Sequence, residues 1–131
     1  MKYLLDTDTL IDYMADRGDA RSRIDAMIEA DDDVALCAVT IAEIYTGLTD
    51  KKRAAWDSWL LVLSYWQISF DVAVQAGIYR KTASESGRTL SVSDSLLAAL
   101  AHERGATLLT SNIKDYPMKD IRVLSLREGA A

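Results

Sequence analysis

Acidic side chains recur at separated places in this 131-residue sequence, each beside an apolar run. Asp6 follows "KYLL", Glu43 lies within "TIAEIY", Asp94 leads into "SLLAAL", and Asn112 and Asp115 follow "TLLT". Half-buried carboxylates that share one place repel each other unless a cation neutralises them. Mg²⁺ and Mn²⁺ are hard cations that prefer such oxygen ligands. The pattern therefore predicts a site for a divalent metal ion.

Helix capping is the alternative role for each acid taken alone. The stretches "TIAE" and "SVSD" have the spacing of a capping box that would use Glu43 and Asp94. Asp6 or Asp8 is placed to cap the first helix, where a carboxylate also suits the positive end of the helix dipole. Capping does not explain why Glu43 and Asp94 stand among apolar neighbours that should be buried.

Short β-like runs alternate with helical patterns along the whole chain. Strands are expected at 2–5, 34–39, 67–70, 107–110 and 121–126, and helices at 9–15, 20–30, 40–48, 72–87 and 93–105. Within 51–66, Trp56, Trp59, Leu60 and Leu63 recur at helical spacing and form an apolar stripe. This alternation predicts one domain over residues 1–131, a three-layer α/β fold with a mainly parallel sheet.

Such a sheet explains how acids far apart in the sequence would meet. The carboxyl ends of parallel strands lie along one edge, and ligands bind at that edge near the point where the strand order reverses. Asp6 directly follows the first predicted strand, and Asn112 follows the strand at 107–110. We therefore expect the acids to converge at this edge.

Composition limits the classes of function. The net charge of −5 argues against a protein that coats nucleic acid, but it does not exclude a nuclease, and it favours a basic partner. Lys51–Arg53 and Arg80–Lys81 are either a basic rim for RNA or ordinary solvated surface. One cysteine, Cys37, excludes a disulfide framework and is expected to be buried. No apolar run approaches a membrane span, and no signal peptide begins the chain, so a cytoplasmic protein is expected.

The stretch "LLDTDTL" resembles the first motif of haloacid-dehalogenase-type phosphatases. That resemblance would make Asp6 a nucleophile and Asp8 a general acid. The match is incomplete, because Thr9 stands where that family usually has glycine, and no acidic pair follows a late strand.

A second resemblance spans nearly the whole chain. The stretches "YLLDTDTLIDYM", "TIAEIYTGL", "LSVSDSLLAALAHERGATLLTSNIKDYP" and "IRVLSL" together resemble a PIN domain of the VapC-type ribonuclease toxins of prokaryotic toxin–antitoxin systems. The resemblance implies a three-layer α/β/α fold with Asp6, Glu43 and Asp94 as the metal-binding acids. Asn112 takes the fourth position, where many relatives have Asp, and Asp115 is a candidate for the missing charge. Asp8 stands where a small polar residue is common.

The same resemblance implies an activity and partners. The activity is hydrolysis of RNA phosphodiester bonds assisted by Mg²⁺, with Mn²⁺ as a substitute, in which Asp6 and Asp94 bind the ion and Glu43 orients the attacking water. Thr110 and Ser111 either bind a phosphate or form a strand-end turn. A cognate antitoxin and a homodimer are the expected protein partners. Because Asn112 is not acidic, a PIN-like module that binds RNA or protein without cleavage stays as the alternative.

Overall fold

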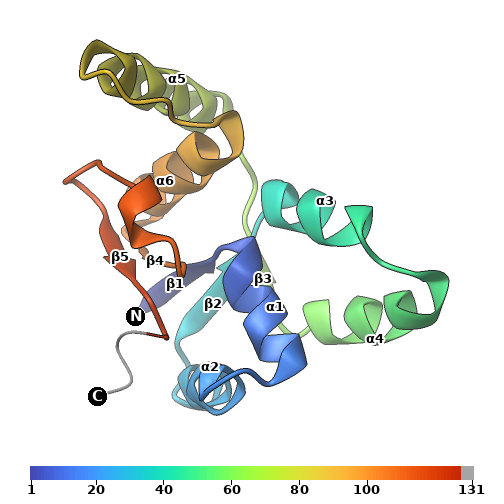
Figure 1. The fold of residues 1–131 in the computed structure, drawn as a ribbon. Coiled ribbons are helices and arrows are strands. Elements are labelled where there is room, and N and C mark those ends of the chain that lie inside the picture. Colours follow the sequence, from blue (N-terminus) through green and yellow to red (C-terminus); the bar gives the residue numbers. More distant parts are fainter. Residues whose placement is uncertain (128–131) are drawn as a thin grey trace.

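A computed structural model describes residues 1–127 (Figure 1). The strands are β1 (Lys2–Leu5), β2 (Asp33–Leu36), β3 (Ser64–Tyr65), β4 (Thr107–Leu109) and β5 (Arg122–Leu124). The helices are α1 (Thr7–Ala15), α2 (Ala20–Glu29), α3 (Ala38–Thr46), α4 (Asp50–Leu60), α5 (Phe70–Glu85), α6 (Val92–Arg104) and the single 3₁₀ turn η1 (Ile113–Asp115). In this part of the chain, no helix is long and apolar enough to cross a membrane.

All five strands are parallel and lie in the order β3-β2-β1-β4-β5, so β1 is the central strand. Neighbouring side chains of β1 point to opposite faces. Leu4 packs in one apolar cluster with α5 and α6, and Leu5 packs in a second with α1, α2, α3 and α4. Figure 1 shows α5 and α6 on one side of the sheet and α1 and α2 on the other, with α3 and α4 to the right, beyond the ends of the strands. The predicted three-layer α/β fold with a parallel sheet is confirmed.

The strand expected at 67–70 is not formed. The edge strand is β3, a few residues earlier, and the Ser69 hydroxyl accepts a hydrogen bond from the Val72 N–H, which caps α5. Phe70 therefore begins a helix, and its side chain is 83% exposed. The alternating pattern of "QISF" favoured a strand, but Ser69 lies three residues before the first buried residue of the helix, Val72, and stabilises the start of that helix as its cap.

Other predicted elements are shorter than expected, and the strand predicted at 121–126 covers only Arg122–Leu124. The strand expected at 34–39 ends at Leu36, because Cys37 is the extended residue that precedes α3. Cys37 is buried, as predicted. The helix within 51–66 ends at Leu60, so Leu63 lies beyond it, although its side chain is still buried.

Candidate active site

Asp6 lies at the carboxyl end of the central strand and is only 9% exposed. Its backbone N–H donates to the Leu109 carbonyl on β4 (2.9 Å), and one of its carboxylate oxygens, Oδ1, accepts from the Thr7 N–H (2.7 Å). Asp6 therefore caps α1, which was one of the two roles open to it. Its other oxygen, Oδ2, points to the residues that follow β4.

A buried tyrosine connects Asp6 to Asp94. The Tyr116 hydroxyl lies 2.9 Å from Asp6 Oδ2 and 3.1 Å from Asp94 Oδ1, and its side chain is 5% exposed. The Thr110 hydroxyl donates to the same Asp6 oxygen (2.9 Å). One hydroxyl has a single proton to donate, so Tyr116 serves one of the two carboxylates fully at any moment.

Asp94 reaches this point from the first turn of α6 and not from a strand. Its backbone N–H donates to the Ser91 hydroxyl (3.1 Å), so Ser91 is the residue that caps the helix. The Asp94 carboxylate is half-buried and turned towards Tyr116. A role in capping alone does not account for that contact.

The electrostatics of the two aspartates are alike. Burial raises the pKa of Asp6, against the hydrogen bond from the Thr7 N–H, and the nearby Asp8 carboxylate adds to the rise. Burial also raises the pKa of Asp94, with further contributions from Asp115 and Glu43. The pKa of Tyr116 is raised strongly by burial and by both carboxylates, so this hydroxyl stays protonated.

Glu43 approaches the same edge from α3. Its side chain is exposed and accepts a hydrogen bond from the Thr7 hydroxyl (2.7 Å). The capping box expected for Thr40 and Glu43 is not formed, because α3 begins earlier, after Cys37. The Thr40 hydroxyl instead donates to the Leu5 carbonyl (3.2 Å), which ties α3 to the central strand.

At the fourth site position, where many relatives have Asp, this chain has Asn112, and Asp8 lies next to it. Asn112 donates its side-chain N–H to Asp8 Oδ2 (2.9 Å), and the same oxygen accepts from the Ser111 N–H (3.1 Å) and the Ser111 hydroxyl. Asp8 thus anchors the loop after β4 and places its own charge beside Asp6. Asp115 lies in η1 with an exposed side chain, and its charge acts on Asp94.

Within residues 1–127, no lysine, arginine or histidine forms an ion pair with Asp6, Asp8, Glu43, Asp94 or Asp115. In the same range, no three His, Cys, Asp or Glu side chains form a group already placed to hold a metal ion. Between Asp6 and Asp94 stands the Tyr116 hydroxyl. The donor chemistry fits a hard divalent cation, since every donor is oxygen and the acids lack a countercharge.

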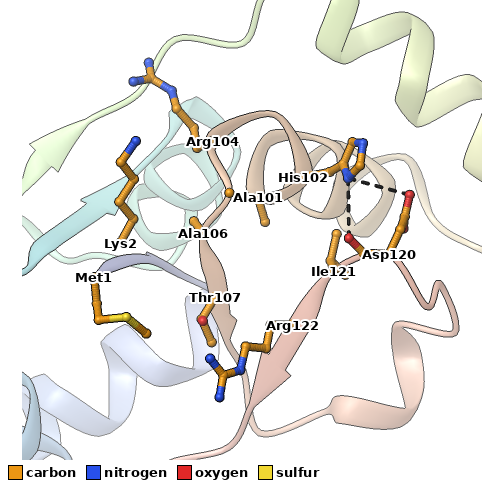
Figure 2. Close-up of a pocket in the computed structure, with 11 residues that line it drawn as sticks. Met1, Lys2, Ala101, His102, Arg104, Ala106, Thr107, Asp120, Ile121 and Arg122 are labelled. Carbon is orange, nitrogen blue, oxygen red and sulfur yellow. Dashed lines mark hydrogen bonds and ion pairs between the residues drawn. The ribbon is translucent and has the colours of Figure 1, made fainter.

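The described part of the chain has cavities at both edges of the sheet, and their linings differ. Asp94 and Asp115 line a cavity of about 240 Å³ beside the carboxyl edge of the sheet. A larger cavity of about 570 Å³ lies at the amino edge, between the starts of β1, β4 and β5 and the end of α6 (Figure 2). Figure 2 shows the charged ends of Lys2 and Arg122 pointing away from each other, whereas His102 and Asp120, which also line this cavity, pair with each other.

Sequence reasoning missed Tyr116, which is one residue of a longer matching stretch, next to Asp115 and the single proline, Pro117. The available signal was a tyrosine, with its polar hydroxyl, placed shortly after a buried strand. A buried tyrosine hydroxyl usually finds a hydrogen-bond partner, and here the partners are the two acids.

The five-stranded parallel sheet with helices on both of its faces agrees with the family that the sequence matches. Residues 3–121 match the PIN domain family, and the chain belongs to it. The match favours the PIN resemblance over the phosphatase one.

Individual relatives are distant but cover nearly the whole chain. Ribonuclease VapC19 of Mycobacterium tuberculosis (strain ATCC 25618 / H37Rv) is 24% identical over 115 residues, which are 88% of this chain and 92% of the relative. A chain in the crystal structure of VapBC2 from Rickettsia felis, bound to a DNA fragment from their promoter, superposes with a TM-score of 0.84 at 21% identity, covering 95% of this chain and 98% of that one. A chain of VapBC-1 from nontypeable Haemophilus influenzae gives 0.81 at 20% identity, with the same coverage.

Proposed function

We propose that this chain is a metal-dependent endoribonuclease and the toxin of a toxin–antitoxin pair. The observation that carries the proposal is the placement of Asp6 and Asp94 around one buried hydroxyl, with Glu43 close by and no cation supplied by residues 1–127. Membership of the PIN family and the likeness to a relative named as a ribonuclease support it.

In this proposal Asp6 and Asp94 hold Mg²⁺, or Mn²⁺ in its place. When bound, the ion lowers the pKa of a coordinated water and stabilises negative charge on the phosphate. Glu43, fixed by the Thr7 hydroxyl, orients the attacking water. Thr110 holds the Asp6 carboxylate in position through its hydroxyl.

The fourth position is shared among several residues. Asn112 positions Asp8, whose carboxylate adds negative charge beside Asp6. Asp115 adds charge on the side of Asp94. We therefore assign the missing acid of this position to Asp8 and Asp115 together, and to Asn112 a positioning role.

The proposed antitoxin has a groove to occupy. A cavity of about 670 Å³ lies along α3 and α4 beside the edge strand β3, and its lining is mostly apolar: Leu36, Ile41, Tyr45, Leu60, Leu61, Leu63 and Tyr65. Glu43 lies on the same helix as two of these residues. We propose that an apolar antitoxin segment fills the groove and places an arginine or lysine against the acids. A complex that leaves Asp6, Glu43 and Asp94 open to solvent would contradict this.

The proposed homodimer has a candidate surface on α5. Phe70, Val74 and Ile78 recur every four residues and are 83%, 47% and 51% exposed, which forms an apolar stripe on one face of the helix. Such a stripe marks an interaction surface. Replacing Ile78 by lysine is expected to shift the sedimentation coefficient to that of a monomer, and an unchanged dimer would exclude this surface.

The test of the function is cleavage of single-stranded RNA by the purified chain free of antitoxin. We expect cleavage with Mg²⁺ or Mn²⁺, none in chelator, and a fall by orders of magnitude in Asp94→Asn while the fold persists. Asparagine caps a helix nearly as well as aspartate, so a role in capping alone predicts full activity for this variant. A wild-type chain that binds RNA but never cleaves it would favour the alternative, a binding module without catalysis.

A further inference from the structure

Two cavities adjoin beside Asp94 and share part of their lining. The first, of about 240 Å³, contains the two acids of this side, Asp94 and Asp115. The second, of about 370 Å³, lies along the carboxyl-terminal half of α5 and is lined by Arg80, Lys81 and Ser84. The shared residues are Arg88, Thr89 and Leu90, in the segment that joins α5 to α6. The two cavities therefore form one surface track with basic residues at one end and carboxylates at the other.

The cations of this track keep their charge exposed. Arg80 donates through Nε to the Leu90 carbonyl (3.0 Å), and Arg88 donates through Nη2 to the Lys114 carbonyl (2.7 Å). These bonds fix the two side chains at the rim without neutralising them, because a carbonyl carries no net charge. In the described part of the chain, none of Arg80, Lys81 and Arg88 forms an ion pair.

This arrangement contrasts with the net charge of the protein. A chain of net charge −5 repels a polyanion, and five acids stand around the proposed catalytic centre. RNA reaches such a centre only where fixed cations offset that repulsion. Arg80, Lys81 and Arg88 meet this requirement, because they form no ion pair in the described chain and line the two cavities beside Asp94. The arginine side chain also suits bidentate contact with phosphate.

We propose that this track, from Lys81 past Arg88 to Asp94, binds the sugar–phosphate backbone of single-stranded RNA. Arg80, Lys81 and Arg88 contact phosphates beside the bond to be cleaved, and the hydroxyls of Ser84 and Thr89 lie along the same path. The site deepens the proposed ribonuclease function and rests on it for its substrate. It assigns to the basic residues of α5 the role of a rim for RNA, which the sequence alone left open.

The experiment measures RNA binding without cleavage. The wild-type chain, free of antitoxin and in chelator, is titrated into a fluorescent single-stranded RNA of about 12 nucleotides at several salt concentrations. The Lys81→Ala/Arg88→Ala double variant is expected to bind about tenfold more weakly at low salt. Its salt dependence should fall by roughly 1.4 in log–log slope, since each contact with a single-strand phosphate accounts for roughly 0.7.

A matched control comes from the opposite edge of the sheet. Lys2 and Arg122 line the cavity of Figure 2 and carry the same two charges, so Lys2→Ala/Arg122→Ala is expected to bind RNA as tightly as wild type. An equal loss in both double variants, or no loss in the first, would overturn the proposed track. So would a loss of affinity for the antitoxin alone, which would make this surface a protein interface.

The binding assay tests the RNA track, and the cleavage assay tests the ribonuclease function, so each proposal can be rejected without the other. Binding that depends on Lys81 and Arg88, in a wild-type chain that never cleaves RNA with Mg²⁺ or Mn²⁺, would support the track and reject the ribonuclease. The single variant Lys81→Ala tests the proposal without a risk of misfolding, because the Lys81 side chain is exposed on α5. Arg88 is less safe to replace, because it ties the segment after α5 to the Lys114 carbonyl. The single variant should show about half of the change in slope.

Discussion

Asp6, which caps α1, and Asp12, which lies within that helix, are both buried aspartates, 9% and 4% exposed, and their surroundings differ in kind. Asp12 accepts two hydrogen bonds from one guanidinium, from Arg127 Nε (2.7 Å) and Nη2 (2.8 Å), and Arg17 lies 3.6 Å away. Asp6 accepts from one backbone N–H and two hydroxyls, and no cation in residues 1–127 pairs with it.

The difference supports the proposal that Asp6 is a functional carboxylate and Asp12 a structural one. A buried charge is costly unless it is paired, and the chain supplies the partner of Asp12 itself. For Asp6 the chain supplies only neutral donors and places a second acid, Asp94, across one hydroxyl. Residues 1–127 supply no positive charge to Asp6, which favours the proposed cation there.

The largest expected effect concerns activity. Asp6→Asn should lower metal-dependent RNA cleavage by about a thousandfold, because it removes one of few anionic ligands, while the metal-free protein stays folded. Asp12→Asn should leave the rate unchanged and lower the free energy of unfolding by about 1–2 kcal/mol, less than for a fully buried pair because Arg127 is half-exposed.

Cleavage rates and urea unfolding of both variants check this prediction. A rate for Asp6→Asn within tenfold of wild type would break the contrast between the two aspartates, as would a large loss of rate in a folded Asp12→Asn protein.

The next effect is stabilisation by the ion itself. Mn²⁺ or Mg²⁺ at about 100 times its Kd should raise the free energy of unfolding by about 2.7 kcal/mol, because the ion binds only the folded arrangement of the acids. Thermal unfolding with and without millimolar ion measures the shift. It should shrink in Asp6→Asn and persist in Asp12→Asn. An unchanged midpoint of the wild-type protein would remove the metal site.

A smaller effect is expected from the bridging hydroxyl. Tyr116→Phe should weaken Mn²⁺ binding by about tenfold, because groups that hydrogen-bond to ligating carboxylates fix their orientation. Tyr79→Phe is the matched control, since the Tyr79 hydroxyl donates to Asp120 (2.9 Å) on another part of the surface. Electron paramagnetic resonance of free Mn²⁺ measures both affinities. Equal or tighter binding by Tyr116→Phe would show that the hydroxyl does not orient the acids.

The smallest effect is a dependence of metal-free stability on pH. The pKa values of Asp6 and Asp94 are raised above 3.8, so the folded state holds these protons more tightly than the unfolded chain. Their contribution to the free energy of unfolding therefore falls as pH rises from 3.8 through the raised values. In chelator, Asp94→Asn should gain stability relative to wild type as pH rises. A difference that stays constant from pH 4 to pH 8 would contradict this.

Much of the fold can be predicted from local pattern. The run "KYLL" and the helix that ends at Gly105 are predictable because buried strands are apolar runs and because glycine readily takes the left-handed conformation found there (φ 62°). The strand expected at 67–70 was wrong because Ser69 caps a helix. A serine in a strand and a serine that caps a helix look alike in the sequence, and packing of the next residues against the core decides between them.

Less of the site could be predicted. The position of Asp6 at the carboxyl edge followed from the parallel sheet, whereas Glu43 and Asp94 reach that edge from α3 and α6. The partnership of Asn112 with Asp8, and of Tyr116 with both Asp6 and Asp94, joins residues that in two of the three pairs lie about a hundred positions apart. Such contacts depend on side-chain direction and on loop geometry after β4, and hydrophobic periodicity contains neither.

The central position of β1 also determines at what stage of synthesis the candidate site can form. Its neighbour β4 pairs Tyr3 with Thr107, and Thr110 and Tyr116 reach Asp6 from still later positions. A ribosome adding about 5–20 residues per second needs roughly 5–20 s to pass from the first aspartate to these partners. A nascent chain stalled before β4 is therefore expected to be inert towards RNA. Arrested chains of graded length would reveal the residue at which the proposed cleavage begins, and the translating ribosome would not be exposed to that activity before then.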